Sequence, residues 1–146
     1  MKQATPAIQR LAGYLLALEA DGSEQTRTGA NETVSALTKL GSHLTTLVGA
    51  AGFEALLARA LALARAEWAW LGTARVQANG TLEGFREAAQ QQPADAIAKA
   101  SVALMSQLLG LLVVFIGEAL TMRLVQDIWP EAQLDDMISG VKETSV

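Results

Sequence analysis

Residues 100–117, ASVALMSQLLGLLVVFIG, contain no charged side chain over eighteen consecutive positions. The second part of this stretch, Leu108 to Gly117, is entirely apolar. A helical pattern continues on both sides of it, from Pro93 to Trp129, where Pro130 ends it. Because a helix this apolar must cover its surface to be stable, the stretch predicts the buried central helix of a bundle.

Eighteen uncharged residues are also close to the lower limit for a helix that spans a membrane. Ser101, Ser106 and Gln107 interrupt the apolar run, however. Glu118 continues the same helix, and no group of Lys or Arg marks a cytoplasmic end. These features favour a buried helix, and insertion of residues 100–117 into a membrane is kept as an alternative.

Small side chains form one face of this helix. Large residues cover a wide side of the helical wheel, and small residues recur on the opposite side at helical spacing. These are Ala103, Ser106, Gly110, Gly117 and Thr121. Glycine inside a helix costs about 1 kcal/mol relative to alanine, which this chain uses freely. The small-residue face therefore favours close approach of another helix, and we expect it to be an interface. A side of the helix that simply faces solvent is kept as the alternative.

Four charged residues stand beside apolar sequence. Arg123 projects toward the apolar side of the helix, and Asp127 follows one turn later, a spacing that allows an ion pair. Glu67 and Glu118 also have apolar neighbours. Because a buried charge needs a partner, we expect these four residues to be buried and to pair across helices or contact a ligand. We call them the polar handles.

Shorter helices are expected around the central one. Thr5 can cap the first of them, and Pro6 fits its first turn. The helices are predicted at about 6–20, 31–50, 53–71, 82–91 and 93–129. Gly49 and Gly52 indicate a break between the second and the third. The last would be about 55 Å long if unbroken, so we expect a kink near Gly110 or Gly117.

The chain is predicted to be one all-α domain. Its 146 residues match the usual length of a single domain. Polar residues 22–30 are expected to form a mobile loop, and residues 140–146 a frayed tail. The expected fold is therefore a helical bundle of about five helices over residues 1–146.

Composition narrows the classes of function. The chain has no cysteine, which excludes disulfides, thiol nucleophiles and cysteine-based metal sites. Hydrophobic residues make up 51% and charged residues 18%, so oligomerisation or a membrane surface would help to cover the apolar surface. The net charge is −4 and the basic residues are scattered, which argues against nucleic acid as a partner. The N-terminus makes a poor signal peptide, so a cytoplasmic location is expected.

No motif of catalysis, of a cofactor or of a metal site is found. The single histidine, His43, lies in an amphipathic helix without a second ligand one turn away. It lacks the following Lys and Gly that accompany the histidine of phosphotransfer bundles. We interpret it as a surface or boundary residue. Trp68, Trp70 and Trp129 are interpreted as anchors of the core or of an interface.

Three hypotheses for the function follow. The first is a non-catalytic interaction module, an adaptor or regulatory subunit that pairs with itself or with another helical protein through the small-residue face. The second is a membrane-associated protein in which residues 100–117 insert into lipid. The third is a protein that binds an apolar small molecule in a pocket lined by tryptophans, with Glu118 or Arg123 as the polar handle.

Overall fold

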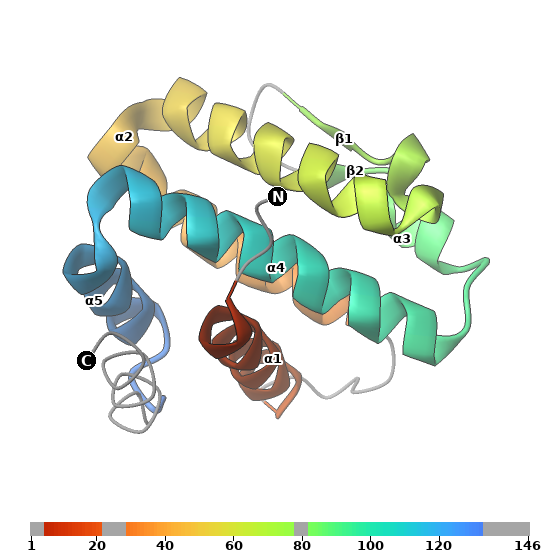
Figure 1. The fold of residues 1–146 in the computed structure, drawn as a ribbon, viewed down its shortest axis with the longest axis horizontal. Helices are drawn as coiled ribbons and strands as arrows, with labels where there is room; N and C mark the ends of the chain where they lie inside the picture. Colours follow the sequence, from red (N-terminus) through yellow and green to blue (C-terminus); the bar gives the residue numbers. More distant parts are fainter. Residues whose placement is uncertain (1–4, 22–28, 78–81, 133–146) are drawn as a thin grey trace.

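The computed structural model of the chain describes residues 5–21, 29–77 and 82–132. These residues fold into five α-helices, one 3₁₀ helix and a two-stranded sheet (Figure 1). In chain order the elements are α1 (Pro6–Asp21), α2 (Gly29–Glu67), η1 (Ala69–Thr73), β1 (Arg75–Val76), β2 (Leu82–Glu83), α3 (Phe85–Ala89), α4 (Ala94–Ile116) and α5 (Glu118–Ile128). The predicted all-α bundle is confirmed.

The uncharged stretch forms most of α4, which packs against α1, α2 and α5. Leu104, Met105 and Leu108 are wholly buried at its centre. The predicted central helix is therefore confirmed up to Leu112, the last buried residue of α4. Beyond Leu112 the prediction of a sheltered stretch is wrong for the single chain, because the last turn of α4 is largely exposed.

The helix α2 bends sharply at Gly49, where the chain turns back on itself (Figure 1). Gly49 has φ 84° and ψ 162°, a backbone conformation that only glycine adopts readily. After the bend, the ring of Phe53 lies so close to Gly41 that a Cβ there would be 2.7 Å from its Cε2 atom. The predicted break near Gly49 is thus correct, and the helices predicted at 31–50 and 53–71 are two arms of one bent helix.

A second glycine separates α4 from α5. Gly117 has φ 92° and ψ 158°, and its carbonyl oxygen accepts the hydroxyl of Thr121 at 2.7 Å in the first turn of α5. The helix predicted over 93–129 is therefore two helices, broken at Gly117 and continuous through Gly110. The new helix ends before Trp129, as Pro130 predicts.

Between α2 and α4 the chain departs from the predicted helices. The second arm of α2 ends at Glu67, and the last predicted turn is replaced by η1. The strands β1 and β2 pair antiparallel, although no strand was predicted there. Only part of the helix predicted at 82–91 forms, because Gly84 has φ 87° and interrupts the helix before α3 begins.

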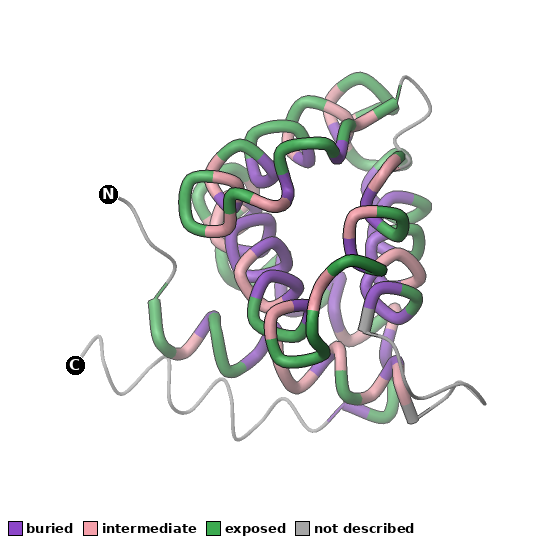
Figure 2. The backbone as a smooth tube through the Cα atoms, turned by 90° about the vertical axis from the view of Figure 1, so that its right-hand side faces the viewer, coloured by how far each residue is buried: buried purple, intermediate pink, exposed green. Residues whose placement is uncertain are grey.

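The core lies between the two arms of α2, α1 and α4. Figure 2 shows the buried residues on the inner sides of the helices, with exposed residues around the outside. Residues 22–28 of the predicted loop and the predicted tail at 140–146 lie outside the described residues. Gly29 and Ala30, expected in that loop, already belong to α2.

Candidate functional site

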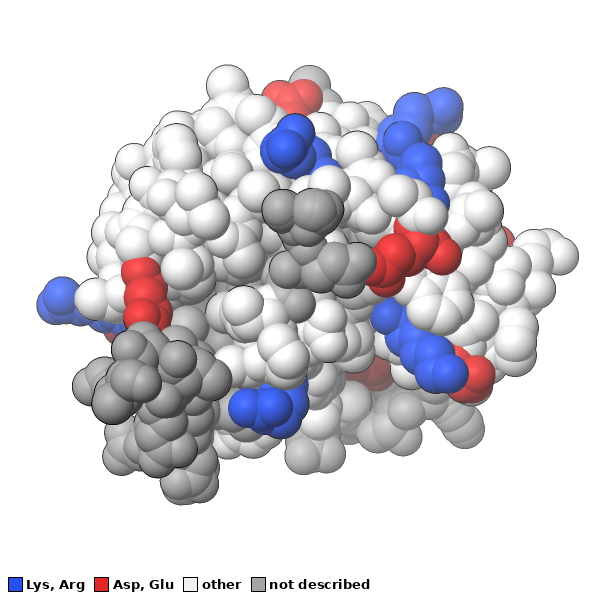
Figure 3. All heavy atoms as spheres, in the orientation of Figure 1, with Lys and Arg blue, Asp and Glu red and all other residues white. Residues whose placement is uncertain are grey.

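The two glycine bends lie at the same end of the bundle (Figure 1). Large apolar side chains are exposed there: Val114 is 85% exposed, Phe115 62%, Leu47 49% and Leu120 39%. We call these four residues the apolar end. Figure 3 shows an uncharged surface over the bend of α2 and the end of α4, with charged side chains again at the level of α5. Exposed apolar groups gathered in one place are typical of a binding surface.

The backbone explains why these side chains lack cover. Gly49 and Gly117 adopt almost the same conformation, in a region of φ and ψ that residues with a Cβ avoid. Each turns the chain away from the direction of the preceding helix, and Gly117 does so directly after the apolar run of α4. Because the following helices leave at an angle, the last turn of α4 has few neighbours within the chain.

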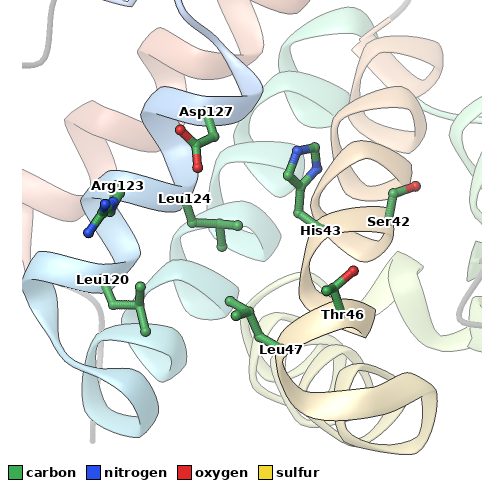
Figure 4. Close-up of a pocket in the computed structure, with 8 residues that line it drawn as sticks. All are labelled: Ser42, His43, Thr46, Leu47, Leu120, Arg123, Leu124 and Asp127. Carbon is green, nitrogen blue, oxygen red and sulfur yellow. The ribbon is translucent and has the colours of Figure 1, made fainter.

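A groove adjoins the apolar end between the first arm of α2 and α5. Its volume is about 420 Å³. The residues that line it are Ser42, His43, Thr46, Leu47, Leu120, Arg123, Leu124 and Asp127. We call it the α2–α5 groove. In Figure 4, Leu47 and Leu124 project into the space between the two helices, His43 lies beside it on α2, and Arg123 points to the outer side of α5. The groove thus has an apolar floor and a polar rim, and it shares two residues with the apolar end.

His43 lies on the rim of this groove and is exposed. Its ring Nδ1 lies 3.1 Å from the carbonyl oxygen of Lys39. Because a carbonyl oxygen can only accept, Nδ1 is the protonated nitrogen in this contact. The bond orients the ring on its own helix.

The small-residue face does not form one continuous surface. Ser106 and Thr121 are buried, and each hydroxyl donates to a carbonyl oxygen one turn earlier on the chain. Gly117 is not helical, so Thr121 belongs to a different helix from Ala103 and Gly110, which are half-buried. The alignment predicted from a single helical wheel is therefore wrong beyond the break. Exposed alanines at helical spacing occur instead on the second arm of α2, at Ala51, Ala55, Ala58 and Ala62.

A second groove, of about 330 Å³, lies on another part of the surface. It is lined by Gln9, Glu67, Trp68, Ala98, Lys99, Val102, Ala103, Ser106 and Gln107. Two residues of the predicted small face thus border a groove, together with one tryptophan. The other tryptophans are elsewhere: Trp70 stacks on Phe85, with ring centroids 5.9 Å apart, and Trp129 is buried in the core. Of the two grooves described, one is lined by a single tryptophan and the other by none.

The four predicted polar handles are all exposed in the single chain. Arg123 and Asp127 line the α2–α5 groove, Glu67 lines the second groove, and Glu118 begins α5 next to the apolar end. The structure therefore brings Arg123 and Asp127 together at one groove and leaves Glu67 at the other. Their predicted burial within the chain is wrong: Glu67 is exposed at the end of α2, and Glu118 is exposed where α5 begins after the turn at Gly117.

A buried carboxylate that the sequence analysis missed connects the elements that form the α2–α5 groove. Glu19 is only 9% exposed. Its carboxylate accepts hydrogen bonds from Ser35 Oγ at 2.5 Å, from Lys39 Nζ at 3.0 Å and from Trp129 Nε1 at 3.0 Å. These contacts join α1, the first arm of α2 and the end of α5, so they hold the two walls of the groove at a fixed separation.

The hydrogen bonds also set the charge state of Glu19. Burial raises the pKa of this carboxyl, but the donors Ser35, Lys39 and Trp129 stabilise the ionised form and lower the pKa below its ordinary value. The sequence contained one signal for this residue. Glu19 follows Ile8, Ala12 and Leu15 at helical spacing, which places it on the buried face of α1. That Trp129 is its hydrogen-bond partner could not be inferred from the spacing of residues.

Among the described residues no group of three His, Asp or Glu is placed to hold a metal ion. Two helices, Ala30–Glu67 and Ala94–Ile116, are long and apolar enough to cross a membrane by length and composition, a test that core helices of soluble proteins also pass. Comparisons of the chain with protein-family models, with curated proteins and with solved structures find no match.

Proposed function

We propose that this protein is a non-catalytic helical interaction module that assembles with a second copy of itself through the apolar end. The observation that carries the proposal is the exposure of Val114 and Phe115, at 85% and 62%, at the end of a helix that is otherwise well buried. Full burial of a side chain such as Val or Phe contributes about 1.5–3 kcal/mol. A partner that covers this end would therefore gain a large apolar contribution from very few residues.

The surrounding charges favour a protein partner over a lipid surface. Glu118 lies three residues after Phe115, and Asp127 lies on the rim of the adjoining groove. Acidic groups beside an apolar patch are repelled by anionic lipid, and the net charge of −4 acts in the same direction. A protein surface can instead offer basic groups at matching positions.

The interface proposed from the structure therefore differs from the one that the sequence predicts. The small-residue face of α4 is partly buried by the chain itself, so the contact is assigned to the apolar end rather than to Ala103, Gly110 and their neighbours. The role as an adaptor or regulatory subunit and the cytoplasmic location remain part of the proposal.

Two other functions have an observation in their favour. The apolar composition of α2 and α4 favours membrane association, in which the apolar end would enter the lipid. The α2–α5 groove, at about 420 Å³, has a volume typical of small-molecule sites, which favours an apolar ligand. Both are distinguished from self-association by the experiment that follows.

The test is the mass of the purified chain by light scattering, over a series of protein concentrations and without detergent. We expect about twice the chain mass of 15.4 kDa. The variant Val114→Gln/Phe115→Gln keeps good helix formers at both positions and is expected to be monomeric. Ala62→Ser, an exposed position on the second arm of α2, is the matched control and should remain a dimer.

A monomer at every concentration would contradict the proposal. Flotation of that monomer with neutral liposomes, lost in the double variant, would establish the membrane function instead. A co-purified apolar compound that Leu124→Gln no longer retains would establish the ligand-binding function.

A further inference from the structure

We infer that the dimer is isologous, with Phe115 of each copy seated in the α2–α5 groove of the other and Glu118 of each copy facing Arg123 of the other. This inference rests on the proposed self-association and specifies its geometry. A two-fold interface uses the same patch on both copies, so the patch must be complementary to itself. At the apolar end, Val114 and Phe115 project from the surface, and we call these two residues the projection. The α2–α5 groove beside them is the concave part of the same patch.

The groove fits the projection in size and in chemistry. A cavity of about 150 Å³ can hold a benzene molecule, so about 420 Å³ has room for the Phe115 ring and part of Val114. Leu47, Leu120 and Leu124 line the groove with apolar groups. Aromatic side chains that enter such pockets are the usual anchors of protein interfaces.

The projection and the groove are also adjacent on the surface. Leu120 belongs to both, and it lies five residues after Phe115 across the Gly117 break. Leu47, from the other wall of the groove, is likewise half exposed. In a two-fold arrangement these leucines lie near the axis, where each copy covers the same residue of the other.

The charges around the patch complement one another under the same symmetry. Glu118 flanks the projection, and Arg123 stands on the rim of the groove. The two lie five positions apart on α5, which is not a spacing that brings side chains together on a helix. The ion pairs among the described residues are Lys39–Glu19 and Lys99–Asp95, so neither charge is used in one.

When Phe115 enters the groove of the second copy, its neighbour Glu118 is carried toward the rim on which Arg123 stands. The two-fold axis repeats this contact, which gives two reciprocal ion pairs around an apolar centre. An acidic and a basic group on opposite sides of one apolar patch fit a second copy of the same chain. Lipid would leave Glu118 and Asp127 without basic partners.

The test uses charge reversal at these two positions. Glu118→Arg alone and Arg123→Glu alone each place like charges opposite one another twice, and each should raise the dimer Kd about tenfold or more. The double variant Glu118→Arg/Arg123→Glu restores opposite charges and should return the Kd to near the parent value. Lys99→Glu, which changes the net charge as Arg123→Glu does, lies outside the patch and should leave the Kd unchanged.

Mixing the two single variants gives the sharpest result. In a mixed dimer one copy presents arginine at both positions and the other glutamate at both, so each contact across the axis is again attractive. We expect the mixture to form heterodimers in large excess over either homodimer, measured by native mass spectrometry with one copy isotope-labelled. Circular dichroism of every variant establishes that the helices are intact.

The outcomes separate the two levels of the proposal. If the parent chain is monomeric, the proposed self-association itself is overturned. If the parent is a dimer that Val114→Gln/Phe115→Gln dissociates, but the mixed charge variants show no preference for each other, self-association stands and the seating of Phe115 with Glu118 against Arg123 is overturned.

Discussion

The indole Nε1 of Trp129 donates a hydrogen bond of 3.0 Å to Oε1 of Glu19, which lies 110 positions earlier in the chain. Both side chains are almost fully buried. The same carboxylate oxygen accepts Lys39 Nζ at 3.0 Å. This contact ties the end of α5 to α1 and α2, and it therefore fixes the wall of the groove that carries Arg123 and Leu124.

Loss of this hydrogen bond should destabilise the chain. In Trp129→Phe the carboxylate keeps Ser35 and Lys39 but loses its third donor, so we expect the free energy of unfolding to fall by about 1–3 kcal/mol. The free energy of unfolding is measured by urea denaturation, monitored by circular dichroism. Lys99→Ala, which removes an exposed ion pair on α4, is the control and should change stability by less than about 0.5 kcal/mol.

The stability that Glu19 contributes should disappear in acid. Because the folded protein lowers the pKa of Glu19 below the ordinary value of 4.5, the unfolded chain takes up a proton first as the pH falls. The contribution is therefore fully present above the unfolded pKa and is lost as the pH falls through the folded pKa. The difference in free energy of unfolding between the parent and Glu19→Gln should be constant from pH 7 to about pH 5 and shrink below it. A difference that grows on acidification would show that the sign is wrong.

Glycine substitutions should have opposite effects at two kinds of position. Gly117 has φ 92°, and a Cβ there would meet nothing within 4 Å, so the cost of Gly117→Ala is backbone strain alone. We expect a loss of about 1–3 kcal/mol in thermal or urea unfolding. Gly13 lies within α1 with ordinary helical geometry and only a contact of 4.0 Å to Val102. Gly13→Ala should stabilise the chain by about 0.5–1 kcal/mol.

The sharp turn in α2 depends on a close contact that a methyl group would prevent. A Cβ at Gly41 would lie 2.7 Å from the Phe53 ring, and both residues are buried. Gly41→Ala should therefore destabilise the chain by about 1–3 kcal/mol. The matched test is Gly41→Ala/Phe53→Leu, in which the smaller side chain makes room for the methyl group. It should be less destabilising than the sum of the two single changes, and simple additivity would show that the contact is not what matters.

The sequence predicted those parts of the fold that depend on local pattern. The uncharged run from Ala100 predicted the central helix. A break was expected at Gly49 or Gly52 and a kink near Gly110 or Gly117, and the bends lie at Gly49 and Gly117, where φ is near +90° and only glycine is free of strain. The pairing of β1 with β2 was missed, because each strand has only two residues and carries no alternating pattern.

The candidate site was predictable only in part. Arg123 and Asp127 were singled out and do lie together at a groove. The small-residue face failed because a helical wheel assumes one continuous helix, whereas the break at Gly117 places Thr121 on a different axis from Ala103. Exposure of Phe115 could not be read from hydropathy, which is the same for a residue in the core and for one at an interface.

Self-association should also appear as a dependence of thermal stability on protein concentration. Because a partner that binds only the folded chain stabilises it by mass action, the Tm of the parent should rise as the concentration is raised. Val114→Gln/Phe115→Gln removes the apolar contact and should have a Tm that does not change with concentration. At high dilution, where neither protein is associated, the two Tm values should converge, because Val114 and Phe115 are exposed in the single chain and contribute little to its own core. A lower Tm for the double variant at every dilution would mean that these side chains support the fold of the monomer, and that their exposure is not the mark of an interface.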